Sequence, residues 1–313
     1  MIAFGCSITD PEMYERCAGR GIELVREPDS PVFAHAATGS LPRNYNILLD
    51  QARELGDELE ALVLLHQDSE IVDPRFCATL REAISDPMVA VVGCVGSIGA
   101  RSIAWWEGSV TWASFTHRYP EHEFGGGEFP AFAWGFDDMP AWAQTGAVDN
   151  LDGFLLGLTP WAIQNLRFDE SLGKSHGYDA DLCLQAREAG RKVVTADIKV
   201  VHHHSLELIG DPEAWVEAHI RVAEKWDGRG LMDREEAGDL DQRARRAEAE
   251  AGLMRLRLAA MDLQAKALAR QLEGQIEDLT EHLAGVERTQ SWRLTRPLRA
   301  LGRRLRRSSP DTG

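Results

Sequence analysis

A buried apolar strand that runs directly into a carboxylate is the first feature of the sequence that could do chemistry. The segment LVLLHQDSEI places Asp68 just past the strand, and His66 precedes it by two residues. Side chains on one face of a strand repeat every two residues, so both would point the same way if the extended geometry continued. A carboxylate at the carboxyl end of a strand can hold a divalent cation against a diphosphate. The alternative is a solvated turn aspartate.

Two further carboxylates open a helical pattern. In HGYDADLCLQAREAG, Asp179 and Asp181 stand at the start and Leu182, Leu184 and Ala186 follow. The helix dipole stabilises carboxylates in a first turn, so capping alone would explain them. The second interpretation is that one of them is a general base that takes a proton from an attacking hydroxyl group. Their spacing does not decide between the two.

Three consecutive histidines end the last apolar strand pattern. In VVHHHS, an extended backbone places His202 and His204 on one face and His203 on the other. Three imidazoles together at a strand end favour a metal or anion site over ordinary surface histidines. A zinc deaminase site is disfavoured, because the cysteine ligands and the HxE spacing are absent from the sequence.

These side chains need a scaffold that brings them together, and the rest of the sequence predicts one. Short apolar runs predict strands at Ile2–Phe4, Ile22–Val25, Leu62–His66, Val89–Val95 and Lys192–His202. Amphipathic runs predict helices at Pro11–Ala18, Arg43–Leu55, Pro74–Ser85, Asp179–Ala189 and Pro212–Trp226. This alternation is typical of a parallel α/β sheet, whose ligands bind at the carboxyl ends of the strands.

Composition and charge limit the classes of function. The 313 residues carry a formal net charge of −16, which argues against non-specific binding to nucleic acid. The charge is uneven: the stretch from Val286 to Gly313 is +6 and the remainder is −22. The five cysteines show no CxxC pairing, so neither a disulfide framework nor a cysteine zinc site is indicated. Without a signal-peptide pattern or an apolar run of about 18 residues, we expect a cytoplasmic protein.

The character of the sequence changes after Asp227–Gly230. Apolar residues then follow 4-3 spacing, interrupted only by the polar seam positions Gln275 and His282, at Leu240, Ala244, Ala247, Ala251, Met254, Leu258, Met261, Ala265, Leu268, Leu272, Leu279 and Val286. This repeat predicts a coiled-coil stalk over 229–288 that joins two or more copies of the chain. The alternative is a single helix that folds back onto the domain.

Five segments, in this order, resemble bacterial family-2-like glycosyltransferases with the GT-A fold, over about residues 1–228. The segments are LPRNYNILLDQA, LLHQD at the place of the Asp-x-Asp motif, VDNLDGFLLGL, GYDADLCLQAREAGRKV at the place of Glu-Asp-x-Asp-Leu, and VVHHHS. The resemblance implies a GT-A (Rossmann-like) mixed α/β sheet with flanking helices, which the α-helical coiled coil follows. Two positions depart from the family's pattern: His66 stands where the first Asp is expected, and Tyr178 where a Glu is common.

The resemblance also implies a metal and a base. Asp68 would bind Mn²⁺ or Mg²⁺ that bridges the diphosphate of a nucleotide-sugar donor, with His202 or His204 as a further ligand. Asp179 would be the base of an inverting displacement, in which the attacking hydroxyl group approaches from the face opposite the departing phosphate.

Four further residues have implied binding roles. Asp29 would lie by the nucleoside, Arg43 and Asn44 near the nucleotide, and Asp152 by the donor sugar. The expected function is sugar transfer to a glycan or lipid-linked acceptor, as in cell-surface polysaccharide synthesis. The alternative is a catalytically impaired sugar-nucleotide or carbohydrate-binding protein with a scaffolding coiled coil, which the departure at His66 would explain.

Two regions remain open from the sequence. The tryptophans of the Gly- and Trp-rich stretch Ala104–Gln144 could stack on sugar rings or form a hydrophobic plug. The tail over 289–313 contains SWRLTRPLRALGRRLRR, which alternates apolar residues with arginines and loosely resembles the ends of some polysaccharide glycosyltransferases. Such a basic amphipathic segment can bind an anionic membrane surface, here the inner face of the cell membrane. A solvated cationic tail is the alternative.

Overall fold

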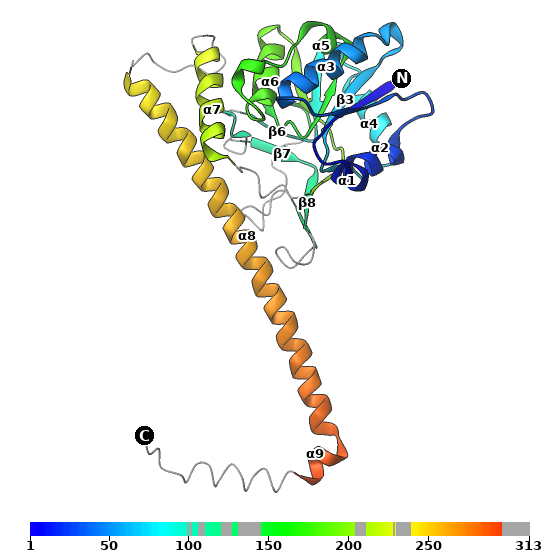
Figure 1. Ribbon diagram of the computed structural model, residues 1–313, viewed down its shortest axis with the longest axis vertical. Helices are drawn as coiled ribbons and strands as arrows, with labels where there is room; N and C mark the ends of the chain where they lie inside the picture. The colour runs from blue at the N-terminus through cyan, green and yellow to red at the C-terminus, as the bar shows by residue number, and fades with distance from the viewer. Residues whose placement is uncertain are drawn as a thin grey trace. The chain divides into compact units, whose positions relative to one another are not determined.

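A computed structural model describes residues 1–98, 100, 102–105, 110–119, 127–130, 145–203, 211–227, 229 and 239–295 (Figure 1). The chain divides into two compact units, Met1–Leu263 and Gln264–Gly313. The first unit contains the sheets and their flanking helices. It continues past residue 228, where the sequence suggested a boundary, and takes in the start of the long helix.

A seven-stranded mixed sheet forms the centre of the first unit, in the order β10-β13-β5-β12-β3-β1-β2. Its strands are β1 (Ile2–Ile8), β2 (Val32–Ala36), β3 (Ala61–His66), β5 (Val89–Gly93), β10 (Ala147–Val148), β12 (Leu155–Leu158) and β13 (Lys192–Thr195). β1 runs parallel to both β2 and β3, so the three strands end at the same edge of the sheet. β12 runs antiparallel between β3 and β5.

Helices cover both faces of this sheet (Figure 1). One face packs on α3 (Leu41–Arg53), α5 (Pro160–Asn165) and α6 (Tyr178–Glu188). The other packs on α2 (Arg20–Val25), which follows α1 (Pro11–Tyr14) and a π-helical turn (Glu15–Gly19), and on α4 (Phe76–Ala83). Leu62 and Leu64 of β3 face the first layer and Val63 and Leu65 the second, because side chains alternate along a strand. The expected fold class, a mixed α/β sheet with flanking helices, is confirmed.

Two small sheets extend from the edge where the parallel strands end. One has the order β11-β6-β7 and the other β4-β14-β8-β9. Their strands are β4 (Ser69–Ile71), β6 (Val95–Ile98), β7 (Val110–Ala113), β8 (Phe115–Tyr119), β9 (Gly127–Pro130), β11 (Asn150–Leu151) and β14 (Val200–His203). The expected strands Val89–Val95 and Lys192–His202 are therefore each divided, since the chain leaves the large sheet partway along both.

One expected strand was wrong. Residues Ile22–Val25 lie in α2, because Ala18, Ile22 and Val25 are buried at helical spacing while Leu24 between them is 53% exposed. The second strand of the parallel set is instead β2, an edge strand whose half-exposed residues give only a weak apolar signal. The other expected helices are present, and α7 spans Pro212–Trp226 as the sequence predicts.

The helix α8 (Asp239–Arg288) includes the whole heptad segment from Leu240 onward. Within the first unit its residues Ala249 and Leu253 belong to a buried cluster with Trp215 and Val222 of α7. Three seam positions lie on another face and are exposed, at 53% for Met254, 62% for Leu258 and 62% for Met261. The two alternatives from the sequence are thus compatible: one face of the helix packs on the domain, and Met254, Leu258 and Met261 of the seam remain uncovered.

The second unit, described by itself, continues the same seam. Leu268, Leu272 and Leu279 are each about half exposed or more. The short helix α9 (Gln290–Leu294) follows a break at Thr289, whose hydroxyl group caps it. Residues 296–313, with most of the basic tail, lie outside the described part of the chain. Among the described helices, none is long and apolar enough to cross a membrane.

Candidate active site

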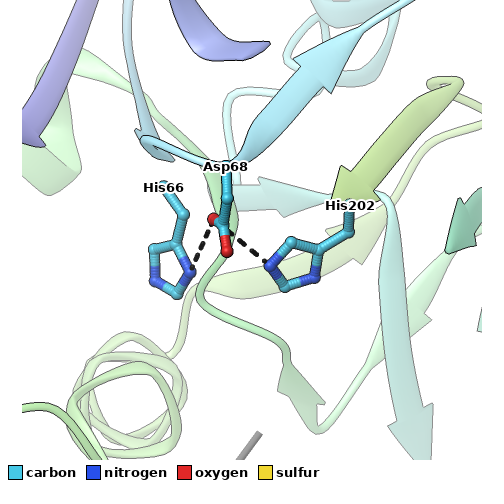
Figure 2. Close-up of side chains that lie close together, drawn as sticks. All are labelled: His66, Asp68 and His202. Carbon is cyan, nitrogen blue, oxygen red and sulfur yellow. Dashed lines mark ion pairs between the residues drawn. The ribbon is translucent and has the colours of Figure 1, made fainter. Parts of the chain in front are cut away.

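The chain builds a cluster of three potential metal ligands where β3 ends. His66 is the last residue of β3, and the chain turns at Asp68 into β4. β4 pairs antiparallel with β14, and this register places His202 of β14 opposite Ser69, the residue after Asp68. The Asp68 carboxylate therefore lies between the imidazoles, with its Oδ1 3.5 Å from Nε2 of His202 and 4.0 Å from Nδ1 of His66 (Figure 2). The three ligand atoms lie within 4.8 Å of one another.

Within this cluster, Asp68 and His202 stabilise each other's charged forms. Burial would raise the pKa of Asp68, but the attraction and hydrogen bond of His202 and the nearby His66 hold it well below its usual range. Burial lowers the pKa of His202, yet the Asp68 carboxylate outweighs it and the pKa of His202 is raised. The pKa of His66 is lowered, chiefly by burial. One carboxylate oxygen and two imidazole nitrogens form a donor set suited to a divalent transition-metal ion.

His202 and His203 separate as strand geometry requires. His202 faces Asp68, and its ring stacks on Phe154 at 4.5 Å between centroids. His203 faces the other way, where its Nε2 is 3.0 Å from the Glu70 carboxylate. His204, the other expected metal ligand, lies outside the described residues. The cluster contains His66 in addition, so the residue that departs from the Asp-x-Asp pattern still supplies a ligand atom.

A pocket of about 350 Å³ opens beside Asp68 at the carboxyl ends of β1, β2 and β3. Its lining includes His66, Asp68, Asn44, Lys174 and Ser175. The pocket has the size and position of a site for a nucleotide in an open sheet of this kind.

The expected nucleotide-binding residues reach this pocket to different extents. Asn44 lines it, but its side chain is also structural: it donates to the Ser7 hydroxyl at 2.9 Å and accepts from the Thr38 N–H at 3.0 Å. Arg43 is exposed on the same helix and is not among the lining residues. Asp29 is a correction, because it lies in the exposed turn at the amino end of β2, opposite the edge where β2 ends near the pocket. The misassigned second strand caused this error.

Asp152 occupies the turn between β11 and β12, and hydrogen bonds fix both of its oxygens. Oδ2 accepts from Nε1 of Trp105 at 2.6 Å, and Oδ1 accepts from the Phe154 N–H at 3.2 Å. Trp105 is only 6% exposed and belongs to the sheet's core cluster, so it is a buried plug. Trp106, Trp134 and Trp142 lie outside the described residues, as does the side chain of Trp112.

The structure distinguishes the two carboxylates of the GYDADL segment. Asp181 is fully buried and accepts hydrogen bonds from Trp226 Nε1 at 2.8 Å and from the amide of Gln185 at 2.7 Å. The ammonium group of Lys225 lies 2.8 Å from it. Asp181 therefore joins α6 to α7, and its complete burial keeps both oxygens away from a substrate.

Asp179 points toward Asp152 and the turn before β12. Its Oδ2 accepts from the Gly153 N–H at 2.9 Å, and its Oδ1 accepts from the Ala180 N–H. Burial, together with the negative charge of Asp152, raises the pKa of Asp179 to about 7. A carboxyl group with that pKa is suited to proton transfer at neutral pH.

Two residues of the site were not assigned by the sequence. Tyr178 places its hydroxyl group 2.7 Å from Nε2 of His66. Lys174 lines the pocket and brings a positive charge to it. The segment GKSHG, with glycines at both ends, was the available signal for Lys174, since it marks a tight loop directly before α6.

Comparison with known proteins gives one relative in sequence. No family model matches the chain. The streptomycin biosynthesis protein StrF of Streptomyces griseus is 30% identical over 208 residues, which cover 66% of this chain and 67% of that protein.

Solved structures give distant likenesses. The crystal structure of GalNAc-T7 with UDP, GalNAc and Mn²⁺ has a TM-score of 0.45 at 12% identity and covers 80% of this chain and 54% of that one. The mannosyltransferase PcManGT from Pyrobaculum calidifontis, in complex with GDP-Man and Mn²⁺, has a TM-score of 0.40 at 14% identity and covers 96% of this chain and 83% of that one.

Proposed function

The chain belongs to the family of the streptomycin biosynthesis protein StrF, and from this premise we propose that it is a glycosyltransferase that uses a nucleotide-sugar donor. Membership of this family shows common ancestry, and the reaction has to be argued from the site. The observation that carries the reaction is the ligand cluster His66, Asp68 and His202 beside a nucleotide-sized pocket. A half-buried carboxyl group with a raised pKa, Asp179, is fixed nearby on α6.

The cluster would hold Mn²⁺ or Mg²⁺ through the Asp68 carboxylate and the two imidazoles. When bound, such a cation neutralises negative charge on the diphosphate as it departs, which stabilises the transition state more than the ground state. Lys174 adds a positive charge to the same pocket. The charge of Asp152 helps to raise the pKa of both His202 and Asp179, which fits a place by the donor sugar.

Asp179 supplies the base. The oxygen of the acceptor hydroxyl group forms a bond to the sugar's anomeric carbon while the bond from that carbon to the diphosphate breaks. The hydroxyl proton passes to the Asp179 carboxylate, and the bonding electron pair leaves with the diphosphate. Attack from the opposite face inverts the anomeric centre. The Gly153 and Ala180 N–H groups hold the carboxylate in place for this step.

A panel of UDP-, GDP- and dTDP-sugars tests the function with the full-length protein. We expect one donor to bind in the presence of Mn²⁺ and to be consumed when a hydroxyl acceptor, or water, is present. Binding without any turnover would support the alternative, a sugar-nucleotide-binding protein. The acceptor, a glycan or a lipid-linked sugar as in cell-surface polysaccharide synthesis, is then identified by product analysis.

The pH dependence follows from the raised pKa of Asp179, about 7. A base acts only when deprotonated, so kcat/KM should fall about tenfold for each pH unit below that pKa and level off above it. The measurement is initial rate against pH from 5.5 to 8.5 at saturating Mn²⁺. A rate that stays level between pH 5.5 and 7 would reject Asp179 as the base.

Self-association through the exposed seam is a second part of the proposal. A seam of Leu, Met and Ala needs a partner surface, most simply a second copy in a parallel dimer. Changing both Leu268 and Leu272 to Glu places charges in the seam, so the mass measured by light scattering should halve. Thr280→Glu, on an exposed position beside the seam, should leave the mass unchanged. A monomeric wild-type protein would contradict the coiled coil.

We also propose that the protein is cytoplasmic and that its basic tail binds anionic lipid on the inner face of the cell membrane. The contrast between a +6 tail and a −22 remainder supports this. Full-length protein should float with anionic liposomes at low salt and be released as salt rises, whereas protein truncated after Gln290 should not float. Equal behaviour of the two forms would remove the tail from this role.

A further inference from the structure

The two positions at which the sequence departs from the pattern it resembles are in contact, although 112 residues separate them. The Tyr178 hydroxyl group lies 2.7 Å from Nε2 of His66. That hydrogen bond occupies one ring nitrogen of His66. The other, Nδ1, is directed at Asp68, as the dashed line in Figure 2 shows.

The position of Tyr178 is tightly determined. Its ring is 3% exposed and packs edge-on against Tyr45, with 5.7 Å between centroids. It is the first residue of α6, after Gly177 at φ +76°, a left-handed conformation that favours glycine. A Cβ added to Gly153 would lie 2.2 Å from the Tyr178 oxygen, so only glycine there admits the hydroxyl group.

We propose that Tyr178 is a positioning residue for the cation site. Its hydroxyl group accepts a hydrogen bond from Nε2–H of His66, which fixes the tautomer and commits Nδ1 to a cation shared with Asp68 and His202. Histidines that bind metals are commonly fixed in this way through their second nitrogen. This inference rests on the proposed function for the cation's presence, but it concerns how this chain holds the cation.

The consequence is a site with two nitrogen ligands and one oxygen ligand. Mg²⁺ prefers oxygen ligands, whereas imidazole suits the transition metals, whose affinities rise from Mn²⁺ to Co²⁺. The site should therefore bind Mn²⁺ about tenfold or more tightly than Mg²⁺, and Co²⁺ more tightly than Mn²⁺. Changing His66 to Asp replaces a nitrogen ligand with oxygen and should reduce this discrimination.

The test is titration calorimetry of the full-length protein with MnCl₂, CoCl₂ and MgCl₂ alone, together with pulsed EPR of bound Mn²⁺. In wild type we expect ¹⁴N modulation from coordinated imidazole. Tyr178→Phe keeps the ring and removes only the hydroxyl group, so Mn²⁺ affinity should fall 10- to 100-fold while the circular dichroism spectrum is unchanged. Tyr14→Phe, which removes a half-buried hydroxyl group from outside the pocket lining, should bind Mn²⁺ as wild type does.

Each outcome has one meaning. Equal Mn²⁺ affinity in Tyr178→Phe and wild type, or absent ¹⁴N modulation, would overturn the inference. If Tyr178→Phe fails to fold, the test is the ratio of Mn²⁺ to Mg²⁺ affinity in His66→Asp. A ratio equal to that of wild type would overturn the inference. Metal binding as described without turnover of any donor would leave the inference standing and reject the proposed function. Turnover that persists in EDTA would leave the proposed transfer reaction standing and count against the inference.

Discussion

Changing Asp68 to Ala should abolish the cation-dependent part of donor binding. Asp68 is the only carboxylate of the ligand cluster and stands between its two imidazoles. Without it, the two neutral rings lack the negative charge that balances a divalent cation. The affinity for the nucleotide sugar with Mn²⁺ should then fall by more than about 100-fold, to the value that wild type shows in EDTA.

The matched control for this change is Asp73→Ala, which removes a carboxylate from the turn after β4. Asp73 accepts a hydrogen bond from the Arg75 N–H and does not line the pocket. Titration calorimetry of both variants with the donor, with and without Mn²⁺, makes the comparison. If Asp68→Ala retains Mn²⁺-dependent binding, the cation lies elsewhere and the cluster has only a structural role.

Changing Asp179 to Asn should abolish transfer and leave donor affinity nearly unchanged. An amide keeps the size of the side chain but cannot accept the hydroxyl proton, and general-base catalysis contributes about 10²- to 10⁴-fold. We therefore expect kcat to fall by that factor, while the Kd for the donor, measured by calorimetry, changes little. Wild-type turnover in this variant would move the base role to Asp152.

Asp181→Asn provides the contrast on the same helix turn. Asp181 is fully buried and contacts Lys225 and Trp226, so an amide in its place loses the negative charge that strengthens these contacts, while the half-buried Lys225 keeps its second partner, Asp169. Weakening hydrogen bonds to a buried charged group costs about 1.5–3 kcal/mol of stability. We expect a lower melting temperature and near-normal kcat for the folded protein, the opposite of Asp179→Asn.

Much of the site could be predicted because its residues follow strong local patterns. The strand β3 is a continuous apolar run, so the place of Asp68 at its end was clear. In β14, the two-residue period separated His202 from His203 before any contact was known. Asp179 and Asp181 were predicted together at the start of α6, but one sequence could not separate them. Only the packing of Trp226 on Asp181 did so.

Contacts between distant segments set the limit of prediction. His66 looked like a loss of the metal motif, because the residue type alone does not show that Nδ1 faces Asp68. The contact that gives His66 its orientation comes from Tyr178, 112 residues away. The error at Asp29 has a different cause: β2 is an edge strand with little buried surface, so the apolar face of α2 gave the stronger signal.

Diffraction from crystals grown with Mn²⁺ and a bound nucleoside diphosphate tests the central claim most directly. Data collected at the manganese absorption edge locate the ion independently of any assumption about its ligands. We expect one anomalous peak within coordination distance of His66 Nδ1, the Asp68 carboxylate and His202 Nε2, with the diphosphate of the nucleotide on its open side. A nucleotide bound in the pocket with no peak at this cluster, or with the peak elsewhere, would contradict it.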